Sequence, residues 1–227
     1  MENENLDLTI IYLTYNEHPK KWTDFHFEKL MEAKGVYPLI AVTHEKLGLE
    51  REIYQTEYSH LNMYKKLLEA SRMANTPYIA VAENDILYHP EHFTFYRPPM
   101  DTVAYDMSKW SLFVWNPIYN LRRRKSNATM IAPREYLIEA LKERYEDNEC
   151  PPDRIGEVGR HIHEKALGIT LRNSVEVWCP NPSVILSNPN SIGYKQAHHP
   201  TRKKLGEMQA IDIPYWGKAE DIIKQYV

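Results

Sequence analysis

Apolar runs of strand length alternate with amphipathic segments along the first 90 residues of the chain. The apolar runs lie at residues 6–13, 36–43 and 77–83, with β-branched residues at their centres. Between them, residues 22–34 and 60–75 repeat apolar side chains at the spacing of an amphipathic helix. This order of strand, helix, strand, helix, strand predicts parallel βαβ units with right-handed crossovers.

The second half of the chain is less regular. Short strand-like pieces separated by turns are expected at residues 102–106, 110–115, 129–132, 175–178 and 183–187. The first three of these should extend the sheet in mixed order. Helices are expected at residues 134–145 and 157–167, and a short one from Lys218. The pattern predicts a single α/β domain over residues 1–227, with a mixed, mainly parallel central sheet.

Each of the first three predicted strands ends in a polar segment. Because the carboxyl ends of parallel strands meet at one edge of a sheet, residues 14–18, 43–48 and 83–89 should lie next to one another. The third strand ends in Glu83-Asn84-Asp85, which places two carboxylates one residue apart at that edge. Carboxylates are the ligands that Mg²⁺ and Mn²⁺ take, and such a metal would bridge to phosphates. Acids at this spacing also occur in solvated loops, so the neighbouring loops are what favours a metal site.

Composition narrows the classes of function. The formal charge of −3 gives no overall basic field of the kind that nucleic-acid binding needs, although Arg122 to Lys125 and Arg202 to Lys204 are local basic clusters. Cys150 and Cys179 are far apart and form no CxxC, which favours a reduced, cytoplasmic setting. No stretch approaches the roughly 20 apolar residues of a membrane span, and no signal peptide is evident.

Several common motifs are missing from the chain, namely the P-loop, GxGxxG, GxSxG and HExxH. Their absence disfavours the usual nucleotide hydrolases, dehydrogenases, α/β-hydrolases and zincins. What remains is an α/β nucleotide-type fold that binds phosphate through a metal and has no glycine-rich loop.

Three segments in this order resemble the GT-A glycosyltransferases, most of all small family-2-like members of bacteria and bacteriophages. They are Thr14-Tyr15-Asn16-Glu17, Asn62-Met63-Tyr64-Lys65-Lys66 and the run from Tyr78 through Glu83-Asn84-Asp85 to Tyr88. The resemblance covers about the first 90 residues and continues more loosely through residues 127–134 and 157–161. It implies a GT-A type, Rossmann-like sandwich with a donor-binding half over about residues 1–95 and an acceptor-side half with a tail over about residues 96–227.

The resemblance also implies an activity: transfer of a sugar from a nucleotide-diphosphate sugar, UDP-linked, to a hydroxyl acceptor. The implied donor-binding residues are Thr14, Tyr15, Asn16, Glu17, His44, Asn62, Lys65 and Glu83. The first loop and His44 would hold the base and ribose, while Asn62 and Lys65 would approach the ribose or diphosphate. Asp85 would bind Mn²⁺ or Mg²⁺ directly, and Glu83 would contact the ribose or the metal through water.

The chain departs from the family pattern at the metal site. Its first acid is Glu83 where the family has Asp, and residues 187–190 lack the late histidine that the family uses as a further ligand. His198, next to His199, lies some residues later and is the expected replacement.

An inverting transfer needs a base that takes the proton from the acceptor hydroxyl. Glu157 and Asp153 are the candidates, and Glu157, which precedes Gly159-Arg160-His161, is preferred. Glu157 is otherwise an acid at a helix N-terminus that interacts with the dipole. Without a base, a retaining mechanism stays open. The expected catalytic residues are therefore Glu157 and Asp85.

The sequence leaves the acceptor open: a glycan, a small molecule or a hydroxymethylated base of phage DNA, for which the two basic clusters would be a track. They could instead clamp the diphosphate. A nucleotidyltransferase is an alternative, but residues 14–19 lack its glycine. A non-catalytic nucleotide-binding protein of GT-A type is favoured by the changed metal site. Trp216, in a turn-like stretch, is expected to be exposed and able to stack on a ring, whereas Trp115 and Trp178 are expected in the core.

Overall fold

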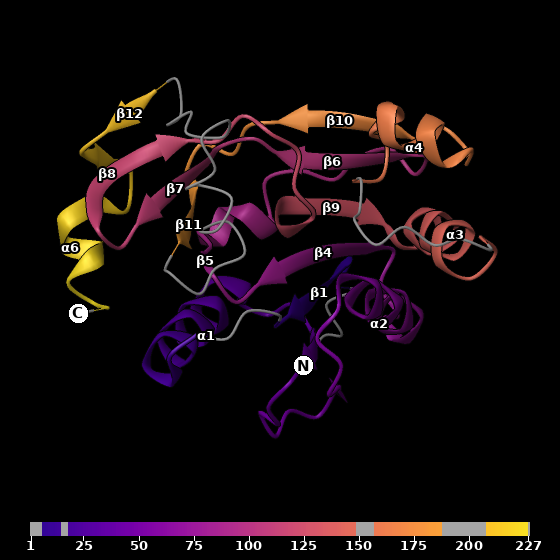
Figure 1. Ribbon diagram of the computed structural model, residues 1–227, viewed down its shortest axis with the longest axis horizontal. Helices are drawn as coiled ribbons and strands as arrows, with labels where there is room; N and C mark the ends of the chain where they lie inside the picture. The colour runs from indigo at the N-terminus through magenta and orange to yellow at the C-terminus, as the bar shows by residue number, and fades with distance from the viewer. Residues whose placement is uncertain (1–5, 15–17, 149–156, 188–207, 227) are drawn as a thin grey trace.

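The computed structural model describes residues 6–14, 18–148, 157–187 and 208–226 (Figure 1). Its main sheet has seven strands in the order β10-β6-β9-β4-β1-β2-β3. These strands are β1 (Leu8–Leu13), β2 (Leu39–Thr43), β3 (Glu52–Tyr54), β4 (Tyr78–Glu83), β6 (Thr102–Asp106), β9 (Met130–Pro133) and β10 (Asn173–Val177). Neighbours are parallel, except that β9 is antiparallel to both β4 and β6. The predicted mixed, mainly parallel α/β sheet is confirmed.

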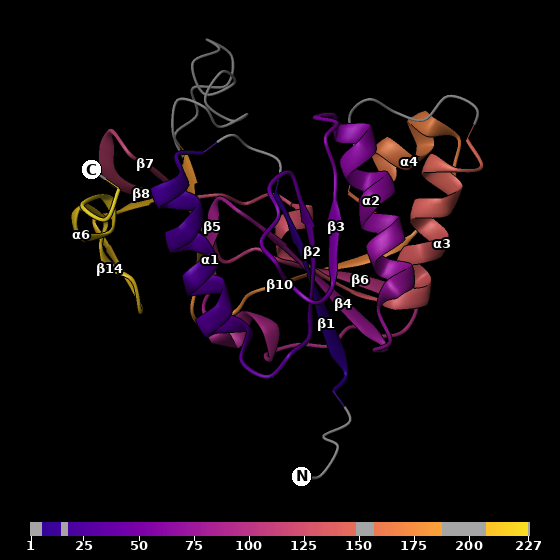
Figure 2. The ribbon, with the colours of Figure 1, turned by 90° about the horizontal axis from the view of Figure 1, so that it is seen from below.

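Helices cover both faces of the main sheet (Figure 2). Helix α1 (Lys20–Lys34) lies on one face, and α2 (His60–Met73), α3 (Arg134–Tyr145) and α4 (His161–Leu167) lie on the other. Strand β1 shows why its sequence is a continuous apolar run: Ile10 and Tyr12 pack toward α1, whereas Ile11 packs toward α2 and α3. A parallel strand buried on both faces needs apolar side chains at successive positions.

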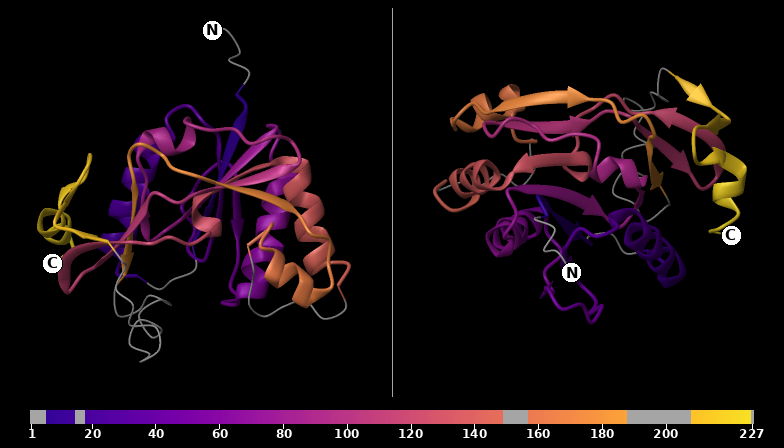
Figure 3. Two further views of the ribbon diagram at one scale, coloured as in Figure 1. Left: turned by 90° about the horizontal axis from the view of Figure 1, so that it is seen from above. Right: turned by 180° about the vertical axis from the view of Figure 1, so that it is seen from behind.

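A second sheet packs beside α1 (Figure 3). Its strand order is β12-β8-β7-β11-β5. The strands are β5 (Ile86–Leu87), β7 (Lys109–Phe113), β8 (Asn116–Leu121), β11 (Ser183–Ser187) and β12 (Gln209–Ala210). The remaining elements are the 3-10 turns η1 (Pro90–Phe93) and η2 (Asn127–Thr129), the hairpin of β13 (Asp212–Ile213) and β14 (Gly217–Lys218), and α6 (Ala219–Ile223). Trp22 and Phe25 of α1 pack against the core of this second sheet.

The last described residues dock onto α1. The indole N–H of Trp22 donates to the backbone oxygen of Tyr226 at 3.0 Å, and the two rings meet edge to face at 4.9 Å. A hydrogen bond also joins the imidazole of His26 to the hydroxyl of Tyr226. The segment of residues 208–226 therefore packs, through Tyr226, against helix α1 near the beginning of the sequence.

Three sequence expectations differ from the structure. The segment at 110–115 joins the second sheet as β7 instead of extending the main one. The helix expected from Glu157 begins at His161, because Gly159 adopts a left-handed φ of 77° that a helix cannot include. Trp216 is half-buried and donates its indole N–H to the Pro182 oxygen, whereas Trp115 and Trp178 are exposed.

Within the described ranges, no helix combines the length and the apolar character that crossing a membrane requires.

Candidate active site

The polar ends of β1, β2 and β4 meet at one edge of the main sheet, as expected. The Thr14 N–H donates to the Val42 oxygen at 3.0 Å, and the Thr14 hydroxyl accepts from the His44 N–H at 3.2 Å. The His44 Nδ1 lies 2.9 Å from the Thr14 oxygen, which joins the first two loops directly. A cavity of about 150 Å³ opens there and includes Asn84 from the third loop.

The walls of this cavity contain groups that the sequence did not single out. The lining residues are Thr14, His18, Lys20, Thr23, His44, Glu45, Leu47, Tyr58 and Asn84. The ring of Tyr58 stacks on that of His44, with centroids 3.8 Å apart and an interplanar angle of 17°. Tyr58 follows β3, a strand of three residues with no alternation to predict it, so its place at this edge was not evident from the sequence.

Glu83 and Asp85 are fixed by contacts from several elements. Glu83 is the last residue of β4, in register with Leu13 of β1. Its N–H donates to the Tyr88 hydroxyl at 2.9 Å, and that hydroxyl donates to the Ala128 oxygen at 2.8 Å. The backbone oxygen of Asp85 accepts from the Leu186 N–H of β11 at 2.8 Å. The turn between β4 and β5 is therefore held by both sheets.

The two carboxyl groups are in an environment that disfavours their charge. Burial, together with the charge of the Asp85 carboxyl group, raises the pKa of Glu83 to about 8, and burial also raises the pKa of Asp85. The guanidinium of Arg124 opposes both shifts. Asp85 Oδ1 is buried and has no hydrogen-bond partner among the residues that the structure describes. A buried carboxylate oxygen without a donor is costly unless a cation or another ligand meets it.

Two basic residues stand near the acids. Lys109 is fully buried, and its ammonium group donates to the backbone oxygen of Arg124 and, at 3.4 Å, to the Thr129 hydroxyl. Burial and the charge of Arg124 lower the pKa of Lys109 to about 8. The acids therefore face a local positive field that comes from the strand β7 and from the loop after β8.

Glu157 lies close enough to Glu83 for its charge to raise the pKa of Glu83. Its side chain is 16% exposed and accepts from Arg160 Nη1 at 3.0 Å. The next residue is anchored, because the Tyr105 hydroxyl donates to the Val158 oxygen at 2.8 Å. The structure thus brings the expected base to the same edge of the sheet as Glu83.

The remaining expected site residues differ in their placement. The Asn62 amide donates to Gln55 Oε1 at 2.6 Å and to the Glu57 oxygen at 3.1 Å, so it braces the loop that carries Tyr58. Lys65 is exposed on α2 and does not line this cavity. Tyr15, Asn16, Glu17, His198 and the alternative base Asp153 lie outside the described residues. Their roles stay predictions.

Searches found no matching family model and no similar curated protein. Nineteen chains of solved structures match, and three of them, all of low identity, are described here. A glycosyltransferase involved in the glycosylation of the major capsid of the virus PBCV-1 is 14% identical over 81% of this chain and 83% of that chain, with a TM-score of 0.43. The catalytic domain of Drosophila β1,4-galactosyltransferase 7 with xylobiose is 8% identical over 96% and 80%, with a TM-score of 0.41. A mutant of that enzyme with manganese, UDP-Gal and xylobiose is 10% identical over the same shares, with a TM-score of 0.39.

All three are glycosyltransferases. Likenesses with TM-scores of 0.43 or less assign no family, substrate or mechanism to this chain. Those have to come from its own residues.

Proposed function

We propose that the protein transfers a sugar from a nucleotide-diphosphate donor, UDP-linked, to an acceptor hydroxyl, with a divalent metal and with inversion at the anomeric carbon. The observation that carries the proposal is Asp85 Oδ1, which is buried and unpaired among the described residues, at the sheet edge where the loops of β1, β2 and β4 meet. Ligands of open α/β sheets bind at this edge.

The side chains at this edge fit a hard divalent cation. Glu83 and Asp85 offer carboxylate oxygens. The described part of the chain contains no group of three or more metal-ligating residues. Two carboxylates are nevertheless enough for Mg²⁺, because this ion takes one or two carboxylates together with phosphate oxygens and water. His198, outside the described residues, is the proposed third ligand.

The cavity beside Asn84 would take one ring of the donor. Its volume of about 150 Å³ is below the roughly 300–1,000 Å³ of whole-ligand pockets. The stacked pair of His44 and Tyr58 offers an aromatic surface, and Thr14 offers a hydroxyl and a backbone group to the edge of a base.

Transfer requires a base, a leaving group and charge compensation. Glu157 takes the proton of the acceptor hydroxyl, the acceptor oxygen bonds to the anomeric carbon, and the bond to the diphosphate breaks with its electron pair on the diphosphate oxygen. A bound metal would neutralise the charge that develops on the diphosphate. Arg124 adds a positive charge beside the acids, and the ion pair with Arg160 orients the Glu157 carboxylate.

Calorimetric titration with UDP tests the proposal. Wild-type protein should bind UDP with Mn²⁺ and much more weakly in EDTA. Asp85→Asn should reduce the Mn²⁺-dependent affinity by more than the roughly 10–100-fold that losing an outer-shell group costs. Asp221→Asn, an exposed acid of α6, is the matched control and should bind as wild type. Equal UDP affinity in Mn²⁺ and in EDTA would contradict the proposal. Binding of UDP without any turnover of a UDP-sugar would favour the non-catalytic alternative.

A further inference from the structure

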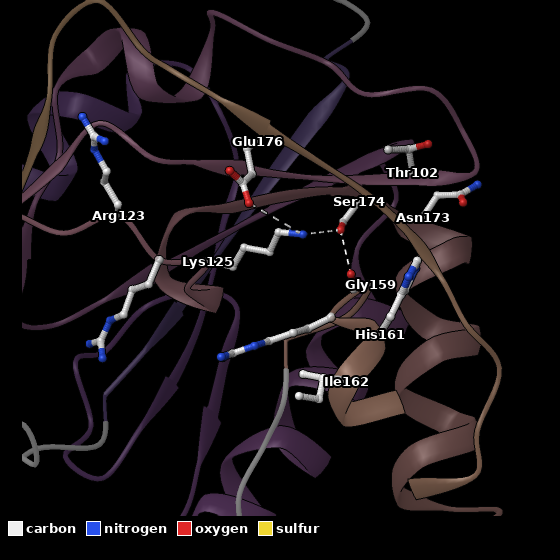
Figure 4. Close-up of a pocket in the computed structure, with 11 residues that line it drawn as sticks. Thr102, Arg123, Lys125, Gly159, His161, Ile162, Asn173, Ser174 and Glu176 are labelled. Atoms are coloured by element: carbon white, nitrogen blue, oxygen red, sulfur yellow. Dashed lines mark hydrogen bonds and ion pairs between the residues drawn. The ribbon is translucent and has the colours of Figure 1, made fainter. Parts of the chain in front are cut away.

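A second and larger cavity lies beside the proposed base. Its volume is about 640 Å³, and the loop after β8, the turn before α4 and strand β10 form its walls (Figure 4). The lining residues are Thr102, Arg123, Arg124, Lys125, Gly159, Arg160, His161, Ile162, Asn173, Ser174 and Glu176. None of the roles proposed so far accounts for this cavity.

The charge of the cavity is strongly positive. Four lining residues are arginine or lysine, and Glu176 is the one carboxylate among the lining residues. Its carboxylate is half-exposed and lies 4.0 Å from the Lys125 ammonium group. The guanidinium groups of Arg123 and Arg124 make no ion pair within the part of the chain that the structure describes. The cavity therefore holds cationic groups that its own acids do not neutralise.

The position of Lys125 is set by its surroundings. Its ammonium group donates to the Ser174 hydroxyl at 2.8 Å, which in turn donates to the Gly159 oxygen at 2.8 Å. The ammonium group also lies 5.9 Å from the centre of the Tyr105 ring. Figure 4 shows Lys125 pointing into the cavity between Glu176 and Ser174. A charged group held in this way is preorganised for a ligand.

The cavity is connected to the candidate active site through two of its residues. Arg160 lines the cavity and pairs with Glu157 at 3.0 Å. Arg124 also lines it, and its charge acts on both Glu83 and Asp85. A molecule in the cavity would thus lie next to the proposed base and on the side of the proposed metal site.

We infer that this cavity binds the acceptor, and that the acceptor is a small molecule or saccharide that carries a phosphate or carboxylate near the hydroxyl that receives the sugar. The inference rests on the proposed function. Lys125, whose ammonium group is held by Ser174, binds the anionic group, since an ammonium group is a usual partner of phosphate and carboxylate. Glu157 then faces the hydroxyl.

A small anionic acceptor fits the cavity better than DNA does. A volume of about 640 Å³ is within the roughly 300–1,000 Å³ of small-molecule sites. Binding along a nucleic-acid backbone instead needs a row of phosphate contacts without intervening acids. Here Glu176 stands among the basic groups, and the whole chain is acidic, with a net charge of −3.

Calorimetry with three probes tests the inference. The probes are glucose 6-phosphate, unmodified glucose, and UDP with Mn²⁺, each titrated into the full chain. Wild type should bind glucose 6-phosphate at least about tenfold more tightly than glucose. A factor of about ten in affinity is what one hydrogen bond between charged groups contributes. The variant Lys125→Gln should lose that preference and keep its UDP affinity. Lys29→Gln, which removes the same charge from α1, should behave as wild type.

Each outcome separates the inference from the proposed function. If UDP binds and glucose 6-phosphate does not, or if the cavity variant keeps the preference, the inference is overturned and the proposed function stands. If glucose 6-phosphate does not bind but a DNA duplex binds wild type and not the variant, the cavity serves nucleic acid and the inference is overturned. If glucose 6-phosphate binds as expected but UDP does not, the acceptor role falls together with the proposed function. Lys125→Met keeps the aliphatic part of this partly buried side chain, so it keeps the test valid if Lys125→Gln fails to fold.

Discussion

At the residue scale, the proposed site depends on three carboxyl groups with different surroundings. Asp85 has a buried oxygen without a hydrogen-bond partner in the described part of the chain, Glu83 is crowded by Asp85, and Glu157 is paired with an exposed arginine. The environment of Asp85 suits a metal ligand. That of Glu83 also suits one, because a cation would relieve the repulsion between the two carboxylates. The environment of Glu157 suits a base, since Glu157 keeps some contact with solvent and with the large cavity through Arg160.

Replacing the proposed base should slow the chemical step without weakening donor binding. We expect Glu157→Gln to lower kcat by roughly 10²–10⁴-fold, because an amide cannot take the acceptor proton. UDP affinity in the presence of Mn²⁺ should stay as in wild type. Steady-state rates of UDP release measure the first effect, and calorimetry the second. Glu139→Gln, an exposed acid of α3, is the control, and an unchanged kcat in Glu157→Gln would rule out Glu157 as the base.

Glu83 should make the stability of the metal-free protein depend on pH. Its pKa is raised to about 8 in the folded state, so the native protein holds a proton from about pH 5 to pH 8 that the unfolded chain releases. The native state therefore binds more protons in this window, and stability falls as pH rises. Glu83→Gln cannot titrate. We expect its free energy of unfolding, relative to wild type, to increase by at least about 1 kcal/mol from pH 5 to pH 8, roughly the worth of one pKa unit.

Urea unfolding in EDTA at the two pH values measures this difference. The comparison with wild type cancels the contributions of His18 and His26, whose pKa values burial lowers. A constant difference at pH 5 and pH 8 would show that Glu83 is not protonated in the folded protein.

The sequence predicted part of this residue-scale arrangement. Glu83 and Asp85 were found because they end an apolar strand, and strand ends have a fixed relation to the sheet edge. The exposed Trp115 and the half-buried Trp216 were not predicted, since exposure of a single aromatic depends on the packing of the second sheet, which no local pattern describes.

At the scale of elements, most of the expected helices and strands are present, including the short strand at 183–187, whereas β3 and β8 were not predicted. The expected helix at 134–145 and strand at 102–106 have the bounds of α3 and β6. Strand β8 was missed because it begins with Asn116-Pro117, residues that usually end strands, and proline is accepted here at the start of the strand. Its pairing with β7 comes from the tertiary structure.

Gly159 illustrates how one residue places an element of the site. A Cβ at this position would lie 2.5 Å from Ser174 Cβ, in addition to the strain of its positive φ. We expect Gly159→Ala to lower the free energy of unfolding by about 1–3 kcal/mol more than Gly168→Ala does, since overpacking adds to the strain. Gly168 is the matched control: its φ is 67°, but nothing lies within 4 Å of the added Cβ. Chemical denaturation of both variants measures the difference, and equal losses would refute the steric argument.

At the scale of the whole molecule, α1 connects two sheets. Its residues Phe27 and Leu30 belong to the core of the main sheet, and Trp22 and Phe25 to that of the second. Asp85, whose backbone is held by β11, lies between these two bodies. The relative position of the sheets therefore sets the geometry of the proposed metal site. The sequence predicted the first sheet but not this second one, because its strands come from four separate parts of the chain.

The docking of Tyr226 on α1 should contribute strongly to this arrangement. The side chain is 5% exposed and contacts Trp22, Phe25 and His26. We expect Tyr226→Ala to reduce the free energy of unfolding by about 3–5 kcal/mol, as removal of a buried aromatic does. Tyr226→Phe keeps the ring and loses the hydrogen bond to His26, so it should cost only about 1 kcal/mol. Urea denaturation tests both, and similar losses in the two variants would mean that the ring contributes little.

The place of β9 in the main sheet affects how the protein folds while the ribosome synthesises it. Strands β1 to β4 occupy one side of the sheet and can pair as soon as they are synthesised, but β6 reaches β4 only through β9, which follows it in the chain. Until residues 130–133 have left the exit tunnel, β4 has an open edge at residues 78–80. We therefore expect the growing chain to pass through a stage with half a sheet, and open edges of this kind attract chaperones and neighbouring chains.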